Sequence, residues 1–342
     1  MENTLKQRNY GLDNLKLSIC VIVVLCHAML PYMGILSKWY FFPVLSNESI
    51  PYNELIFLNE TVSMCAFFML AGYFVPTSYD KQGFKIFMTK KIKRLLIPAV
   101  VIYTYCWTLI PKQMNHVWFL LMLFAFCLLY ALFRHFSKWE IDSEKKRPLT
   151  ILVLSIVLAV LCVSATIIRY KYQLGNYIIY GILYIEPAKL PNYLLTFIFG
   201  VIAKRYDWFN TGASKKNIIF MIATTLFVIA ISLFRNVNQY NYVGSRIYTI
   251  EDCCMCMYVS LLIIWAYNTF LNKTTKVIST LSDNIMGIYI FHVPLLYYVQ
   301  TYTSTWEFYF PLKFVLIFLT VFSLALGMSM LLRKSSTLRN YI

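Results

Sequence analysis

Ten apolar stretches of about 20 residues run along the chain, each long enough to cross a bilayer as a helix. A backbone inside lipid must satisfy its own hydrogen bonds, so continuous stretches of this kind form helices that pack against one another. We therefore predict an all-α fold, a polytopic membrane helix bundle of about ten transmembrane helices. No loop is long enough for a second folded domain, so we expect residues 1–342 to form a single transmembrane domain. The predicted spans are 15–36, 55–76, 93–111, 117–134, 149–169, 190–204, 217–234, 252–271, 283–300 and 311–332.

The sixth span is the least regular of the ten. The region from 170 to 203 contains Gly175, Gly181, Pro187 and Pro191, residues that interrupt regular helices. We therefore expect a broken or re-entrant piece in this region, before a continuous apolar run that ends near 203.

The distribution of positive charge predicts the orientation of the chain. With ten spans, 23 of the 31 Lys and Arg residues fall on the side that holds both termini. Cytoplasmic loops collect positive charge, so both termini are predicted to be cytoplasmic. This bias also explains the net charge of +16 without a nucleic acid partner. Only 13% of the residues are charged, against about 25% in soluble domains, so we expect a multi-pass protein of the plasma (inner) membrane.

Three ionisable residues lie within the predicted spans, where such residues are costly and usually functional. His27 lies about 18 Å from the cytoplasmic edge of the first span, near the bilayer midplane. His292 lies at a similar depth in the ninth span, and Glu60 enters the second span from the outer side. We expect all three to face one cavity, although a buried imidazole that only forms hydrogen bonds within the bundle remains an alternative for His27.

Lys16 and His27 share one face of the first span. Eleven residues turn a helix by about 1100°, which is 20° more than three full turns, and advance it by about 16 Å. This spacing suits an extended ligand whose anionic end lies at Lys16 and whose reactive end lies at His27. A cation that merely extends to the interface is the alternative for Lys16.

A run of cations opens the third span on the predicted cytoplasmic side. Lys90, Lys91, Lys93 and Arg94 give four positive charges in five residues, which would attract phosphate groups. Anchoring of the span by positive residues explains the same run equally well. The nine cysteines fall mostly within spans and lack a matching set of ligands, so no metal site is predicted, although a metal or disulfide role for the cluster at 253–256 stays open.

Six segments of the chain form an ordered set of motifs: 8–16 with His27, 67–74 with Gly72, 94–98, 116–120, 190–200 and 281–294. This ordered set covers nearly the whole chain and resembles the acyltransferase 3 family. Members of that family are integral membrane enzymes that move acyl groups, usually acetyl, from cytoplasmic acyl coenzyme A to hydroxyl groups of glycans or other acceptors.

The resemblance implies that His27 is the catalytic histidine, with Lys16 as the second catalytic residue. His27 would accept the proton of the acceptor hydroxyl, since an imidazole with a pKa of about 6.5 suits this role. Lys16, Lys90, Lys91 and Arg94 would bind the coenzyme A phosphates. Lys16 and Lys91 stand where the family commonly has arginine, so they keep the charge but lack the planar guanidinium.

The acceptor is predicted to be an extracytoplasmic glycan or glycolipid, contacted by Glu60, Trp118 and His292. A place in the aromatic belt of the outer interface is the alternative for Trp118. A covalent acyl intermediate on His27 stays open, as does a homodimer. A polysaccharide or lipid-linked sugar exporter and a catalytically silent membrane scaffold are the alternative functions.

Overall fold

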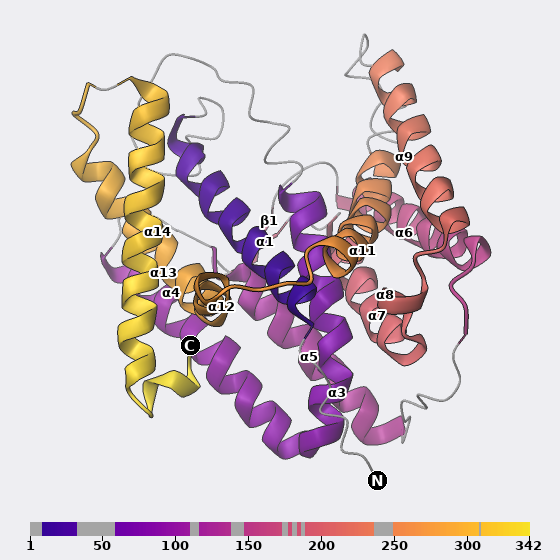
Figure 1. The fold of residues 1–342 in the computed structure, drawn as a ribbon, viewed down its shortest axis with the longest axis horizontal. Helices are drawn as coiled ribbons and strands as arrows, with labels where there is room; N and C mark the ends of the chain where they lie inside the picture. Colours follow the sequence, from indigo (N-terminus) through magenta and orange to yellow (C-terminus); the bar gives the residue numbers. More distant parts are fainter. Residues whose placement is uncertain are drawn as a thin grey trace.

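The fold is a bundle of helices packed around one large apolar core (Figure 1). The predicted helical architecture is confirmed. The computed structural model describes residues 9–32, 59–109, 116–137, 147–172, 177–179, 183–185, 189–235, 249–307 and 309–342.

The first helix, α1 (Tyr10–Met29), carries both Lys16 and His27 on one uninterrupted element, as their spacing predicted. The side chain of Asn9 caps it by accepting a hydrogen bond from the backbone N–H of Leu12 at 3.1 Å. This bond satisfies a backbone group that has no partner within the helix.

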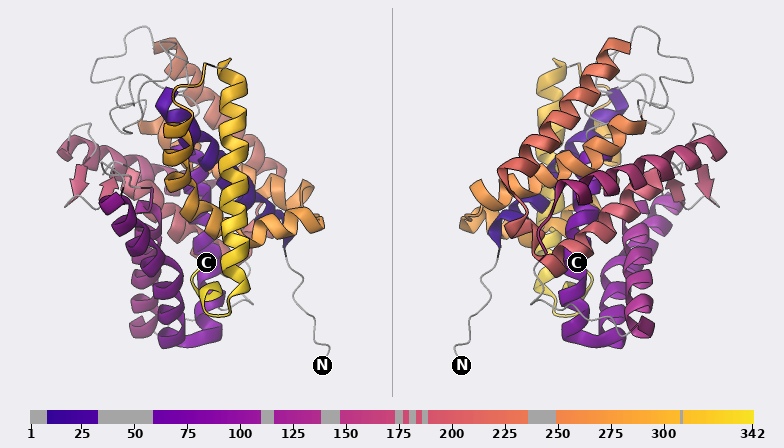
Figure 2. Two further views of the ribbon diagram at one scale, coloured as in Figure 1. Left: turned by 90° about the vertical axis from the view of Figure 1, so that its left-hand side faces the viewer. Right: turned by 90° about the vertical axis from the view of Figure 1, so that its right-hand side faces the viewer.

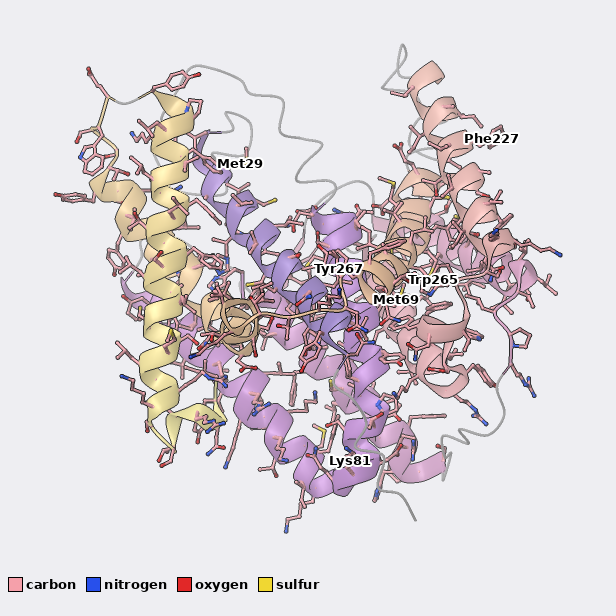
Figure 3. The ribbon with its side chains drawn as sticks, in the orientation of Figure 1. Met29, Met69, Lys81, Phe227, Trp265 and Tyr267 are labelled. Carbon is pink, nitrogen blue, oxygen red and sulfur yellow. The ribbon has the colours of Figure 1, made fainter. Side chains whose placement is uncertain are left out.

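Residues 59–109 are helical along nearly their whole length but turn back at Gly83. This residue has φ 69° and ψ 172°, a backbone conformation that residues with a β-carbon rarely adopt. Lys81 lies at this turn, at one end of the molecule (Figure 3). The predicted spans 55–76 and 93–111 therefore lie on the two sides of the turn. The elements of this run are η2 (Asn59–Ser63), α3 (Met64–Lys91), η3 (Ile92–Leu96) and α4 (Ile97–Leu109).

The helices α3 and α7 (Leu190–Tyr206) pack with their backbones in close approach. A β-carbon at Gly72 would collide with the carbonyl oxygen of Phe197, and one at Gly200 would collide with that of Met69. Small residues at such crossings allow the close van der Waals packing that holds helices together in lipid. These contacts pack α3 directly against α7.

One short hairpin departs from the all-α prediction. The strands β1 (Tyr177–Ile179) and β2 (Leu183–Ile185) pair antiparallel in the region where the sequence predicted an irregular piece. The remaining elements are η1 (Leu30–Tyr32), α5 (Trp118–Ser137), α6 (Ile151–Tyr172), α8 (Trp208–Thr211), α9 (Lys215–Arg235), η6 (Met255–Val259), α11 (Ser260–Phe270), α12 (Lys276–Asp283), α13 (Ile285–Tyr302), α14 (Phe310–Lys334) and η7 (Leu338–Asn340).

Six helical segments among the described residues are long and apolar enough to cross a membrane. The second of them contains two predicted spans, so the six account for seven of the ten. The other three are helical as α7, α9 and α13 but do not meet this criterion. The protein is thus a helical membrane protein, and the number of ten crossings stays a prediction. The six segments are Tyr10–Met29, Asn59–Cys106, Trp118–Ser137, Ile151–Ile168, Thr249–Phe270 and Pro311–Lys334.

The flanks of the bundle are apolar, as contact with lipid requires. Only 17% of the apolar window in α6 and 22% of that in α14 is buried inside the protein. Figure 2 shows α14 along the near flank in its left-hand view. Its exposed side chains include Leu312 and Leu319. Such continuous apolar surface is a sign of membrane contact.

Candidate active site

A cavity of about 890 Å³ lies beside α1, α3, η3 and α13 and is strongly cationic. The four residues predicted to bind the donor, Lys16, Lys90, Lys91 and Arg94, all line it. Among the described residues, three further cations and only two acidic side chains contribute to its lining. These are Lys85, Lys93 and Arg333, with Asp13 and Asp283. The tertiary structure therefore concentrates positive charge from three separate segments of the chain around one space.

Lys16 is held in place at the wall of this cavity. Its Nζ atom lies 3.2 Å from Oδ1 of Asp13, one turn earlier on α1, and 4.0 Å from the centre of the Phe74 ring. The carboxylate and the ring both attract the ammonium group. Lys91 similarly lies over the ring of Phe87, at 5.2 Å. These contacts orient the cations without neutralising the cavity.

The cavity also reaches two residues whose backbone carbonyls form hydrogen bonds with histidine side chains. Val23 and Tyr289 line it. The carbonyl oxygen of Val23 accepts a hydrogen bond from Nδ1 of His27 at 2.7 Å, and that of Tyr289 accepts one from Nδ1 of His292 at 2.6 Å. Because a carbonyl only accepts, both rings carry their proton on Nδ1 when neutral, and their lone pair lies on Nε2.

Three histidines from distant parts of the chain form one cluster. The ring of His292 lies between the other two, with centroid distances of 5.0 Å to His27 and 5.3 Å to His116, and both contacts are edge-on. His116 precedes α5, and its Nε2 lies 3.2 Å from the carbonyl oxygen of Ile290. The hydroxyl of Tyr289 donates to the carbonyl oxygen of His116 at 2.5 Å, so one tyrosine touches both the cavity and the cluster.

Two ring nitrogens of this cluster have no hydrogen-bond partner within the described part of the protein. They are Nε2 of His292 and Nδ1 of His116, and both residues are at least 97% buried. Buried polar atoms are normally paired, so unpaired ones mark a place that is completed by something else. Proton transfer or hydrogen bonding to a substrate would complete it.

The rings of His27 and His292 are in contact, but neither histidine lines the cationic cavity, and nor does Glu60. The expectation that all three face one cavity therefore stays a prediction. His116 was not predicted as a site residue. The sequence placed it only at the outer end of the fourth span. The chain has four histidines, and three of them meet here. Treating every histidine at a span boundary as a candidate would have found it.

Glu60 and Trp118 lie together in a second group, connected by Tyr193. Glu60 forms an ion pair with Lys189, whose side chain is buried. The Tyr193 hydroxyl donates to the backbone carbonyl of Glu60 at 3.3 Å, and the Trp118 ring stacks on the Tyr193 ring at 5.5 Å. The ion pair with Lys189 was not foreseen from the sequence.

Asp252 is a buried acidic residue that the sequence reading overlooked. It accepts hydrogen bonds from Thr61 at 2.6 Å and Asn192 at 2.8 Å and is 1% exposed. Its position at the start of a predicted span was the signal that could have identified it. In the adjoining cysteine cluster, Cys256 faces Cys65, with the two Sγ atoms 2.6 Å apart. Within the described residues, no three His, Cys, Asp or Glu side chains are arranged to hold a metal ion.

The comparison with protein families gives one match over nearly the whole chain. A family model described as an acyltransferase domain, the acyltransferase 3 type, matches residues 9–334. No curated protein and no solved structure matches the sequence. The histidine cluster lies within the matched residues, and so does the lining of the cationic cavity except for Asn340 and Ile342.

Proposed function

Because the chain belongs to the acyltransferase 3 family and is a membrane acyltransferase, we propose that it is an O-acetyltransferase of the cell envelope. It takes the acyl group from acetyl coenzyme A, or a related acyl coenzyme A, on the cytoplasmic side. It transfers this group to a hydroxyl of an extracytoplasmic glycan or glycolipid, which enters from the outer side of the plasma membrane.

The observation that carries this proposal is a cavity that is lined by the cations and that also reaches Val23 and Tyr289, whose backbone carbonyls bind His27 and His292. The histidine rings lie next to these two lining residues and are not themselves part of the lining. Lys91 and Arg94 contribute to one part of its lining, and Val23 and Tyr289, which hold His27 and His292, contribute to another. Coenzyme A has the matching layout, with phosphates at one end and a thioester at the end of a flexible arm. Cations bind phosphates through charge-assisted hydrogen bonds.

The proposed reaction needs one group that takes a proton and later returns it. Nε2 of His27 accepts the proton of the acceptor hydroxyl as that oxygen forms a bond to the thioester carbonyl carbon. When the carbon–sulfur bond breaks, the leaving thiolate takes this proton, which regenerates neutral His27. The products are the acylated acceptor and free coenzyme A. His292 and Glu60 act as positioning residues that hold the His27 ring and stabilise its charged form.

The direct test is an assay of the purified protein with acetyl coenzyme A. We expect release of free coenzyme A to depend on a glycan acceptor, and mass spectrometry should find the acetyl group on cell-surface glycans only when the protein is present. Transport of an unmodified glycan without consumption of acetyl coenzyme A would instead support an exporter.

We expect His292→Ala to lower kcat about tenfold to 100-fold while leaving KM for acetyl coenzyme A nearly unchanged. The reason is that the ring of His292 contacts that of His27, whereas the donor phosphates are bound by the cations that line the cavity, to which His292 does not belong. His292→Gln, whose amide can reach the position of Nε2, should restore part of the activity. Steady-state kinetics of both variants test this prediction. If KM rose by the same factor by which kcat fell, the result would indicate a general loss of structure instead of a positioning role.

The proposed topology has ten spans with both termini in the cytoplasm. Met29 and Lys81 lie at opposite ends of the molecule (Figure 3), which corresponds to outer and cytoplasmic ends in this topology. A cysteine introduced at Ser143 should resist a membrane-impermeant maleimide in intact cells, whereas one at Ser46 should react. The nine native cysteines are mostly buried, so background labelling should be low. Labelling at Ser143 would contradict this orientation.

A further inference from the structure

A second pocket, of about 380 Å³, lies between the end of α13 and the beginning of α14. Tyr289 of α13 lines the cationic cavity, and Tyr298 of the same helix lines this pocket. They are nine positions apart, which corresponds to about 13 Å along the helix. The pocket therefore lies towards the opposite end of α13 from the proposed donor site.

Lys313 is a buried cation in the wall of this pocket. Its side chain is 6% exposed, and Nζ donates one hydrogen bond to the carbonyl oxygen of Trp306 at 2.9 Å. No carboxylate within the described ranges forms an ion pair with it. Lys313 also lies in the first turn of α14, where the helix dipole disfavours a positive charge. An anion in the pocket would relieve both unfavourable effects.

Apart from Thr303 and Thr320, the rest of the lining is aromatic and apolar. Tyr302 and Trp306 contact each other edge-on at 5.8 Å and keep 75% and 41% of their surface exposed. Aromatic rings of this kind offer flat apolar faces on which sugar rings can stack. Leu316 lies on the exposed apolar side of α14 and is 43% exposed, so the pocket opens onto the lipid-facing flank.

The pocket is connected to the segment that carries His27. Ile317 lines the pocket and packs in one buried cluster with Ala28, the residue that follows His27. Gln300, on α13, donates to the carbonyl oxygen of Ala28 at 2.9 Å. A ligand in the pocket would therefore contact the layer of side chains next to the proposed base.

We propose that this pocket binds the acceptor, as a glycan linked through phosphate to a long apolar chain. The phosphate pairs with Lys313, the sugar nearest to it lies against Tyr302 and Trp306, and the chain follows the apolar side of α14 at Leu316. This assignment rests on the proposed function, whose acceptor it names by chemical class. A bilayer phospholipid also has a phosphate and apolar chains, but it has no sugar ring that could stack on the exposed aromatic rings.

The test measures lipid retention by the full-length protein in nanodiscs of neutral phosphatidylcholine. One set is doped with a polyprenyl phosphate that carries a single sugar, and another with the same fraction of phosphatidylglycerol. Native mass spectrometry counts the lipids retained. We expect the sugar-bearing lipid to be retained at least about tenfold more than phosphatidylglycerol, and Lys313→Gln to lower its retention about tenfold.

Matched variants distinguish the contributions of the Lys313 charge, of the sugar contact and of catalysis to lipid retention. Lys313→Arg should restore retention, and Lys276→Gln, which removes an exposed cation of α12, should have no effect. Trp306→Ala should weaken retention of the sugar-bearing lipid but not of bare polyprenyl phosphate. His27→Asn should retain the lipid fully, so a failure of catalysis is distinguishable from a failure of this site.

Two results would overturn the assignment. Equal retention by the native protein and by Lys313→Gln would mean that the pocket does not bind a phosphate. Equal retention of phosphatidylglycerol and the sugar-bearing lipid would identify a site for bilayer lipid, not for the acceptor.

Discussion

Replacing His27 with asparagine should lower kcat for acetyl transfer by about 100-fold to 10,000-fold, which is the usual contribution of a general base. Asparagine has an amide N–H in nearly the position of Nδ1, so it can still donate to the carbonyl oxygen of Val23, as His27 does at 2.7 Å. It has no atom that accepts a proton in place of Nε2. The variant therefore removes the chemistry while keeping the local hydrogen bond.

Two measurements accompany this variant. The melting temperature in detergent should change little, and binding of acetyl coenzyme A, measured as a thermal shift, should persist because the cations of the cavity are untouched. Retained acetyl transfer in a variant that folds and binds the donor would remove His27 from the mechanism.

Replacing Lys91 and Arg94 together with glutamine should raise KM for acetyl coenzyme A by about 100-fold or more. Hydrogen bonds between charged groups contribute about 1.5 to 3 kcal/mol each, and a factor of ten corresponds to 1.4 kcal/mol. Both residues line the cavity, and neither contacts the histidine cluster in the described structure. We therefore expect kcat to change much less than KM.

The control for this prediction is a truncated donor. Acetyl pantetheine keeps the thioester but lacks the nucleotide and its phosphates, so its KM should be the same for the native protein and the double variant. Replacing Lys215 and Lys216, two exposed cations at the start of α9, tests whether overall charge matters. A similar rise in KM with that pair, or with the truncated donor, would contradict a specific phosphate site.

Much of the fold could be predicted because a bilayer permits few backbone structures. The predicted spans coincide with helices in all parts that the structure describes, including α7, α9 and α13, which are not among the six segments that meet the criterion for a membrane span. The short hairpin β1–β2 was not predicted as strands. Its residues occupy the region marked as irregular, where Gly and Pro remove the helical signal without indicating what replaces it.

Part of the candidate site was also predictable. Lys16 and His27 lie on one helix, where a fixed 100° per residue determines their relative directions. Lys90, Lys91 and Arg94 were found because a dense run of cations is visible in any sequence. Their predicted roles stay predictions, since the structure shows where they lie but not what they bind.

The sequence by itself determined which segments are helices, which residues belong to the family pattern, and where cations gather, because these depend on neighbours within a few turns. Only the tertiary structure decided that His116 joins His27 and His292, that Glu60 pairs with Lys189, and that Lys313 lies buried beside aromatic rings. Each of these contacts depends on how helices rotate and approach one another. That geometry is set by packing between distant segments, such as the glycine contacts of α3 with α7, and no local pattern encodes it.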